Sequence, residues 1–329
     1  MIIVLFLIFT FFIAINKSTE SLAALQFNPP TATAYNGSIG MVSFGFDHAF
    51  ANQLLAVNSM AKYNFAGTIY VIVTKIDKNG FMTQQNLTNL YNMGWEIASH
   101  SMTHTKISDP TSDATLRYEI VNSKEMLIAK GFCVAGYVSP YDKITSKSST
   151  YIKSNYNYTF VPVNKQNTLY TITNDGAKYG FPLVLHHMSV GNTRVINNFD
   201  TAKKQIDSAI ANKTWLLMNF HGIDYTANGY STKPELFTQI LDYVKQKYDA
   251  GQLTVATQAG GLGYCNGNSN NLVQKNNNCG GAESCSENSN NVVQLNEDCS
   301  GTFSCDSNNN NIVEVSDGSV EILDTPVTP

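Results

Sequence analysis

The chain has 329 residues, of which 43% are hydrophobic, enough for one large domain or two smaller ones. Its net charge at pH 7 is -4, from 21 basic and 25 acidic residues, and the basic residues form no cluster. This balance argues against nucleic acid as the main partner, because phosphate backbones are bound by dense positive charge. The charged fraction is only 14%, while asparagine, serine, threonine and tyrosine are plentiful, which suits an extracellular protein that contacts neutral sugars.

The first residues form an apolar run over 2–15, interrupted only by Thr10 and followed by Lys17. This run is shorter than the about 20 residues that a membrane-spanning helix needs. We therefore interpret residues 1–20 as a secretory signal peptide, although the usual basic start is missing. If the segment is not cleaved, it would instead anchor the chain in a membrane. Glycosylation sequons at Asn36, Asn86, Asn157 and Asn212 also fit a secreted protein.

Residues 21–39 lack periodicity and contain two adjacent prolines, so they are predicted to form a linker. From residue 40 to residue 262, short apolar runs alternate with segments of helical periodicity. Strands are expected at 41–46, 67–73, 95–98, 134–138, 215–220 and 253–257, and helices at 49–63, 83–93, 112–130, 200–211 and 232–248. Repeated strand-then-helix units indicate a parallel α/β sheet or barrel.

Two helix ends carry specific signals, and one part of the domain is irregular. Gly94 is expected to end the helix before it, because glycine adopts the left-handed conformation of a helix stop. Thr232 and Glu235 are predicted to form a capping box that begins the last helix. Between these helices, the stretch 139–199 has only strand-like pieces, at 169–173 and 182–185.

The composition changes abruptly at residue 263, and the tail 263–329 is rich in asparagine and cysteine. Its cysteines recur every 20 residues, at 265, 285 and 305 and at 279 and 299. Too little apolar surface exists for a core, so disulfides would have to hold any structure. Five tail cysteines leave one unpaired unless it joins another chain, and we interpret Cys133 as a buried thiol. Whether the tail is a small repeat module or a disordered spacer stays open.

Histidines stand at the exits of three predicted strands. His100 and His104 follow one strand, and their spacing of four predicts both rings on one side of a helical turn. The pair Asp47-His48 follows another strand, and His221 follows a third. Neutral imidazole is the commonest side-chain metal ligand. Because parallel folds keep their chemistry at the carboxyl ends of strands, these residues are candidates for a metal site.

Three segments resemble the polysaccharide deacetylases, the carbohydrate esterase family with the NodB homology domain. They are Val-Ser-Phe-Gly-Phe-Asp-His at 42–48, Gly-Trp-Glu-Ile-Ala-Ser-His-Ser-Met-Thr-His at 94–104, and Ser-Pro-Tyr at 139–141. The segments follow the family's motif order, and the resemblance covers about residues 40–262. It implies an irregular (β/α) barrel of the NodB type. Such enzymes remove acetyl groups from N-acetylated sugars such as chitin or peptidoglycan, using a divalent metal, often zinc.

The resemblance implies a metal site made of three imidazoles, those of His48, His100 and His104. The family usually has an aspartate at the position of His48. The change is chemically tolerable, because zinc accepts three imidazoles and keeps an open position for water. An all-imidazole site would make the ion more electropositive and would lower the pKa of its water further.

The resemblance also implies three catalytic roles. Asp47 would be the base that takes a proton from the attacking water, and His221 would be the general acid that protonates the leaving nitrogen. The backbone N–H of Tyr141 would stabilise the oxyanion.

Three departures from the family pattern concern the groups around these residues. Val138 stands where the family has an arginine that pairs with the catalytic aspartate, and Asn219 stands where it usually has leucine. The family's fourth motif, which orients the acid histidine, has no convincing match. His186 or His187 could replace that orienting group.

The sequence therefore predicts a secreted, zinc-dependent deacetylase that acts on an N-acetylated polysaccharide. Three alternatives stay open. The chain could be a weak or inactive sugar-binding protein that kept the barrel and the metal. It could also be an extracellular matrix or wall protein in which the tail carries the main role, or a metallohydrolase that acts on a non-sugar amide.

Overall fold

The computed structural model describes residues 34–162, 184–226 and 228–265, together with four short strands in the tail. The predicted signal peptide and the strand-like piece at 169–173 lie outside the described residues. None of the helices in the described part of the chain could span a membrane.

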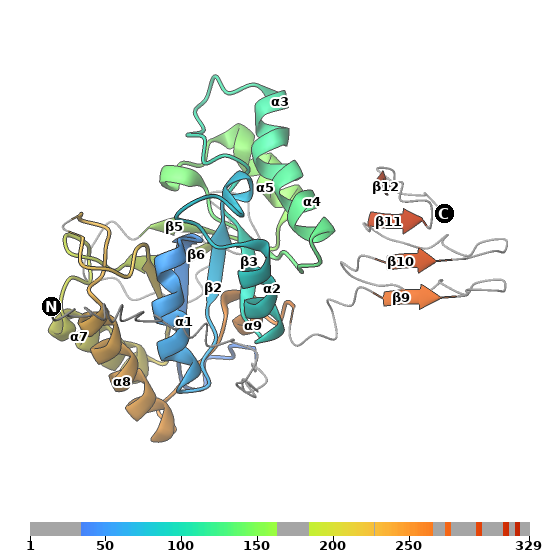
Figure 1. The fold of residues 1–329 in the computed structure, drawn as a ribbon. Helices are drawn as coiled ribbons and strands as arrows, with labels where there is room; N and C mark the ends of the chain where they lie inside the picture. The colour runs from blue at the N-terminus through green and yellow to red at the C-terminus, as the bar shows by residue number, and fades with distance from the viewer. Residues whose placement is uncertain are drawn as a thin grey trace, which may run out of the picture.

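Eight parallel strands form one sheet, in the order β2-β3-β4-β5-β6-β7-β1-β8 (Figure 1). The strands are β1 (Gly40–His48), β2 (Thr68–Val71), β3 (Glu96–Ser99), β4 (Gly136–Tyr137), β5 (Tyr158–Pro162), β6 (Val184–Ser189), β7 (Trp215–Phe220) and β8 (Leu253–Val255). Because β1 also pairs with β2, strands β1 to β7 close into a ring. The fold is thus the predicted irregular (β/α) barrel, and the two-residue strand β4 is one source of its irregularity.

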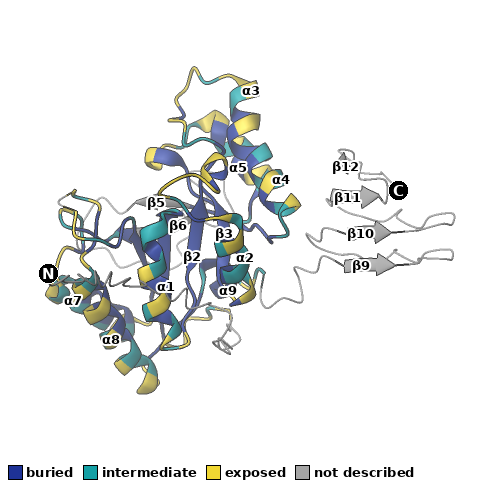
Figure 2. Cartoon of the chain, in the orientation of Figure 1, coloured by how far each residue is buried: buried dark blue, intermediate teal, exposed yellow. Residues whose placement is uncertain are grey.

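Helices cover the outside of this ring, and their outer faces are exposed while the strands are buried (Figure 2). The α-helices are α1 (Leu54–Ala61), α2 (Gln84–Asn92), α3 (Asp113–Leu116), α4 (Asn122–Ala129), α5 (Ser146–Asn155), α7 (Phe199–Asn212), α8 (Pro234–Asp249) and α9 (Gln258–Gly261). Short 3-10 turns are η2 (Ala51–Gln53), η3 (Val73–Lys75) and η5 (Pro140–Asp142), and a π-helical segment, η4 (Arg117–Val121), joins α3 to α4.

Local signals explain where some of these helices begin and end. The Thr83 side chain accepts a hydrogen bond from the backbone of Asn86, and the Asn86 side chain accepts one in return, which begins α2. Gly94, with φ +80°, follows the end of α2 as predicted. The predicted capping box of Thr232 and Glu235 is wrong.

Helix α8 begins two residues later than predicted, for a tertiary reason. Helix α8 starts at Pro234, and its N-cap, Lys233, makes no side-chain capping bond. The Thr232 backbone N–H instead donates to the Gly222 carbonyl at 2.9 Å, in a β-bridge beside the carboxyl end of β7. The Glu235 carboxylate accepts a hydrogen bond from the Tyr225 hydroxyl.

Alternate residues of the strands belong to two different apolar clusters. On β1, Val42, Phe44 and Phe46 pack in the larger cluster under the helices, whereas Met41 belongs to a smaller one. The smaller cluster draws side chains from opposite sides of the ring, so it fills the barrel interior. Since side chains alternate along a strand, Gly45 and Asp47 face the same interior as Met41.

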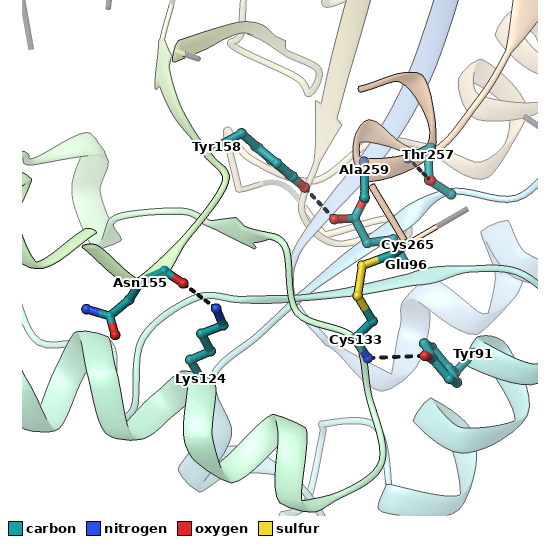
Figure 3. The surroundings of a disulfide bond; sticks show 10 residues. Tyr91, Glu96, Lys124, Cys133, Asn155, Tyr158, Thr257, Ala259 and Cys265 are labelled. Atoms are coloured by element: carbon teal, nitrogen blue, oxygen red, sulfur yellow. Dashed lines mark hydrogen bonds between the residues drawn. A yellow bond between two sulfur atoms is a disulfide. The ribbon is translucent and has the colours of Figure 1, made fainter. Parts of the chain in front are cut away.

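A buried carboxylate closes the amino-terminal end of the barrel. Glu96, at the start of β3, accepts a hydrogen bond from the Tyr158 hydroxyl at 2.7 Å (Figure 3). It also accepts hydrogen bonds from the Thr68 hydroxyl and the Ala259 backbone N–H, both at 2.8 Å. Ala259 lies in the first turn of α9, where a negative charge is favourable. Burial nevertheless raises the pKa of Glu96, and these hydrogen bonds only partly offset the effect.

A disulfide joins the barrel to the start of the tail, next to α9. Cys133, just before β4, is bonded to Cys265, with Cα atoms 6.1 Å apart (Figure 3). The interpretation of Cys133 as a buried free thiol is therefore wrong. The sequence could not show this pairing, because the two cysteines are 132 positions apart and come together only in the folded domain.

The described strands of the tail pair with one another. They are β9 (Gln274–Asn277), β10 (Gln294–Glu297), β11 (Ile312–Val315) and β12 (Val320–Ile322). Strands β9, β10 and β11 are parallel, and β12 is antiparallel to β11. Gln274 pairs with Gln294, so equivalent positions of consecutive repeats stand side by side.

Removing the disulfide should destabilise the barrel. We expect Cys265→Ser to lower the free energy of unfolding by about 2–5 kcal/mol, because a crosslink over a long loop restricts the unfolded chain. Cys133→Ser should cost the same, and the double variant should cost no more than either single one. Urea unfolding measures these values. Alkylation of Cys133 in the unreduced native protein would contradict the pairing.

Glu96 should make the stability depend on pH. The pKa of Glu96 is raised in the folded protein. Above the ordinary glutamate pKa of about 4.3, there is therefore a pH range in which Glu96 is protonated in the folded state but ionised in the unfolded state. Unfolding releases that proton, and the free energy of unfolding therefore falls as the pH rises through this range. Glu96→Gln should lack this component, so its stability relative to the wild type should improve as the pH rises above the ordinary glutamate pKa of about 4.3. A difference that stays constant with pH would contradict the assignment.

Candidate active site

Three strands end at the same edge of the barrel and place the predicted residues there. His48 is the last residue of β1, His100 directly follows β3, and His221 directly follows β7. Strand β1 lies between β7 and β2 in the ring, and β3 comes next. These histidines line one cavity of about 940 Å³, together with Asp47, His104, Tyr141, Arg194, Asp224, Tyr230 and other residues.

Three imidazoles converge in this cavity. The Nε2 atoms of His48 and His104 are 3.1 Å apart, and the nearest ring nitrogens of His48, His100 and His104 all lie within 4.8 Å of one another. Two nitrogens that bind one tetrahedral zinc ion at about 2.05 Å each would stand about 3.3 Å apart. The spacing of these donors therefore fits one metal ion.

The orientation of the His100 ring also fits a ligand. Its Nδ1 lies 2.8 Å from the Val138 carbonyl oxygen. Because a carbonyl can only accept, Nδ1 must carry the proton, and Nε2 keeps the lone pair that a metal needs. Val138 itself packs in the inner apolar cluster, and only its backbone reaches the site.

The loop between the two paired histidines is not the predicted helical turn. Ser101 and His104 have φ of +68° and +69°, outside the right-handed helical region. The Ser101 hydroxyl accepts a hydrogen bond from the His104 backbone N–H at 2.9 Å. Glu119 accepts hydrogen bonds from both the backbone and the hydroxyl of Thr103. A tight, side-chain-braced loop thus brings the rings together, and the spacing of four does not act through a helix.

The histidines are held in the form that binds metals. Burial lowers the pKa of His48 to about 2, and the neighbouring rings of His100 and His104 add to the effect. Burial also lowers the pKa of His104. Both rings are therefore neutral at physiological pH and retain a free lone pair.

Asp47 lies beside these rings and is only 6% exposed. Its Oδ2 atom accepts a hydrogen bond from the Asn219 side chain at 2.8 Å and lies 3.5 Å from Nε2 of His221. Burial raises the pKa of Asp47 to about 8, the Asn219 hydrogen bond opposes this, and the charge of Asp142 adds to it. A bound cation would shift the same carboxyl back towards its ionised form.

Gln53 is a site residue that the sequence did not indicate. It is fully buried in η2, and its Nε2 group donates to the carbonyl oxygens of Asp47 (2.7 Å) and His221 (2.8 Å). One amide therefore ties the ends of β1 and β7 together. No pattern marks this role, because a glutamine in a short turn after a strand is usually a surface residue.

Tyr141 reaches the site through an unusual backbone. Tyr141 and Asp142 have φ of +57° and +55°, a conformation that costs L-residues roughly 1–2 kcal/mol each. The Tyr141 ring is 58% exposed, and its centroid lies 4.9 Å from that of His104. His186 and His187, suggested as orienting groups, belong to strand β6, but their side chains are outside the described part of the structure.

Tyr230 and Arg194 form one wall of the cavity beside His221. The Arg194 guanidinium carbon lies 3.5 Å from the centre of the Tyr230 ring, a cation–π contact. The same ring also lies against that of His221, with centroids 4.9 Å apart. The histidine is therefore flanked by an aromatic ring as well as by the Asp47 carboxylate.

Comparison with known protein families agrees with this geometry. Residues 35–161 match the family model described as polysaccharide deacetylase. This part of the chain is therefore similar to the polysaccharide deacetylase family. The matched segment includes Asp47, the three clustered histidines and Tyr141, whereas His221 lies beyond it. No curated protein matches the chain.

Several solved structures of deacetylases are similar to this chain. The Xyl-CE4 domain of a multidomain xylanase from the hindgut metagenome of Trinervitermes trinervoides has 15% identity and a TM-score of 0.43, covering 68% of this chain and 89% of that one. The peptidoglycan deacetylase PdaC from Bacillus subtilis has 14% identity and a TM-score of 0.41, covering 68% and 90%. BC0361, a polysaccharide deacetylase from Bacillus cereus, has 23% identity and a TM-score of 0.34, covering 36% and 39%.

Zinc binding should depend on the three clustered imidazoles. We expect His48→Ala to lower zinc affinity by about 100-fold or more, because one of three protein ligands is lost. His221→Ala is the matched control, since it removes a histidine from the same cavity but outside the cluster. It should change the affinity by no more than about threefold. Titration calorimetry of the metal-free protein measures both, and equal losses would contradict the ligand assignment.

Proposed function

We propose that this protein is a secreted, zinc-dependent deacetylase that removes acetyl groups from an N-acetylglucosamine polymer such as chitin or peptidoglycan. The observation that carries the proposal is the convergence of His48, His100 and His104 next to the pair Asp47 and His221. This arrangement would provide a metal site, a base and an acid within one cavity.

The three imidazoles would hold the metal. A bound zinc ion would supply Lewis acidity at the substrate carbonyl and would lower the pKa of a water molecule. The neutral state of His48 and His104 suits this role, and the hydrogen bond from His100 to the Val138 carbonyl fixes the remaining ring. Zinc fits a set of three nitrogen donors that leaves one position for water or substrate.

Asp47 would act as the general base. Its Oδ2 atom is engaged by Asn219, while its Oδ1 atom is buried and has no hydrogen-bond partner within the described residues. That second oxygen is available to take the proton from the attacking water. Next to a cation, the carboxylate would be ionised and ready to do so.

His221 would protonate the departing nitrogen, because an amine anion is too poor a leaving group to depart unassisted. Nε2 of His221 lies 3.5 Å from the Asp47 carboxylate, so the two groups could act on the same substrate amide. The backbone N–H of Tyr141 would donate to the oxyanion, a contribution of about 3 kcal/mol in comparable sites.

The mouth of the cavity suits a sugar polymer. Three tyrosines at or near it are strongly exposed: Tyr141 by 58%, Tyr225 by 70% and Tyr230 by 49%. Clustered exposed aromatic rings mark ligand grooves, and their apolar faces can pack against the C–H faces of sugar rings.

An extracellular location is supported by the disulfide. Cys133 and Cys265 form a structural crosslink, and such bonds persist in oxidising compartments. The apolar run at 2–15 and the sequons, of which Asn36 and Asn212 are exposed, agree with secretion.

A second candidate function is a sugar-binding protein with little or no catalysis. The observation in its favour is that the hydrogen bond to Asp47 comes from the neutral amide of Asn219, whereas Val138 occupies the position of the family's arginine. Acetate release from N-acetylglucosamine oligomers, with and without a chelator, separates the two. Release that the chelator abolishes and zinc restores supports the enzyme, and binding without release supports the alternative.

Replacing the base should separate metal binding from chemistry. We expect Asp47→Asn to retain zinc and to reduce the turnover number by about 100-fold or more, because the amide cannot accept the proton. Zinc content by elemental analysis and acetate release by a coupled assay give the two values. If the variant keeps full turnover, Asp47 is not the base.

A further inference from the structure

Two paired residues of the barrel interior, Gly45 and Asn219, lie next to the candidate catalytic residue Asp47. Gly45 of β1 and Asn219 of β7 are paired residues of neighbouring strands. A Cβ atom on Gly45 would lie 3.0 Å from Oδ1 of Asn219 and 2.9 Å from Cε2 of Tyr70. Real Cβ atoms essentially never show a contact as short as the one with Tyr70, and the contact with Asn219 is tighter than nine in ten real ones, so these neighbours would have to move. The missing side chain at position 45 therefore leaves the space that the Asn219 amide occupies.

The amide uses this space to contact one oxygen of Asp47. Its Nδ2 group donates to Oδ2 at 2.8 Å, and Asn219 is only 2% exposed. Oδ1 of the same carboxyl has no partner within the described part of the chain. A single hydrogen bond thus distinguishes two otherwise equivalent oxygens, and water cannot easily replace it in a buried site.

We infer that Asn219 is a positioning residue that orients the Asp47 carboxylate, and that Gly45 is required because it makes room for the amide. The inference rests on the proposed deacetylase function. It goes further by linking Gly45 and Asn219, which themselves reach neither metal nor substrate, to the turnover rate. A neutral amide can hold the carboxylate without cancelling the negative charge that a base needs.

Asn219→Leu tests the first part, since leucine has a similar volume and no donor. The turnover number should fall by about 10- to 100-fold, because misplacement of a catalytic group by about 1 Å has effects of this size. KM and zinc content should stay within about twofold of the wild type. A turnover number that stays within that same range would overturn the inference.

Ser43→Ala is the matched control for lost hydrogen bonding in the barrel interior. Ser43 also lies on β1, donates to the Ala256 carbonyl at 2.6 Å and accepts from the Trp215 indole at 2.9 Å. Its loss should lower the melting temperature at least as much as Asn219→Leu does, yet leave the turnover number within about twofold. If Ser43→Ala lowers turnover as strongly, the effect of Asn219 is only structural.

Gly45→Ala tests the second part through a double-mutant cycle. In the wild-type background, the added methyl group should displace the amide and lower turnover by about tenfold. In the Asn219→Ala background, only the contacts with Tyr70 and Gln258 remain, and Gly45→Ala should lower turnover several-fold less than in the wild type. Equal losses in both backgrounds would show that Gly45 does not act through Asn219.

A last measurement does not depend on activity. The unfolding equilibrium constants of Asn219→Leu, Asp47→Ala and the double variant are measured in urea without metal. The change caused by the double variant should differ by about fivefold or more from the product of the two single changes. Additive values would overturn the inference. If the wild type releases no acetate but these values are non-additive, the proposed function fails while the contact that orients Asp47 stands.

Discussion

The pairing of β1 with two neighbours is the constraint on which the site depends. Strand β1 pairs with β7 through Met41–Phe46 and with β2 through Gly45–His48, and this closes the ring. The end of β1 is thereby held between the ends of the flanking strands. Asp47 and His48 can then meet His221 on one side and His100 on the other. A slip of one residue in either pairing would turn Asp47 out of the barrel, since side chains alternate along a strand.

The interior of this barrel contains two carboxylates, one towards each end, and both accept hydrogen bonds from neutral donors. Glu96 is held by two hydroxyls and a backbone N–H, and Asp47 by the Asn219 amide. Val138 and Asn219, which depart from the family pattern, contribute in different ways to the barrel interior. Val138 extends the apolar cluster inside the barrel, while Asn219 supplies a hydrogen bond to the carboxylate from a different strand.

Sequence reasoning failed where the decisive contact lies far away in the chain or depends on loop conformation. Thr232 looked like a helix cap, but its backbone bonds to Gly222 beside β7. Cys133 looked like a free thiol, but its partner is 132 residues away. The loop from His100 to His104 looked like a helical turn. In the structure, Ser101 and His104 adopt positive φ, and Glu119 braces the loop through Thr103.

The sequence by itself determined the alternation of strands and helices and the chemical types of the candidate ligands. Both are local properties, because side-chain periodicity and donor chemistry are properties of short segments. Only the tertiary structure decided which donors meet: the three imidazoles, the contact of Asp47 with Asn219 and His221, and the role of Gln53. These contacts join residues from distant segments, and several depend on left-handed backbone at His48, His104 and Tyr141. Such conformations are costly for non-glycine residues and persist only when the surrounding packing imposes them, which no local pattern reveals.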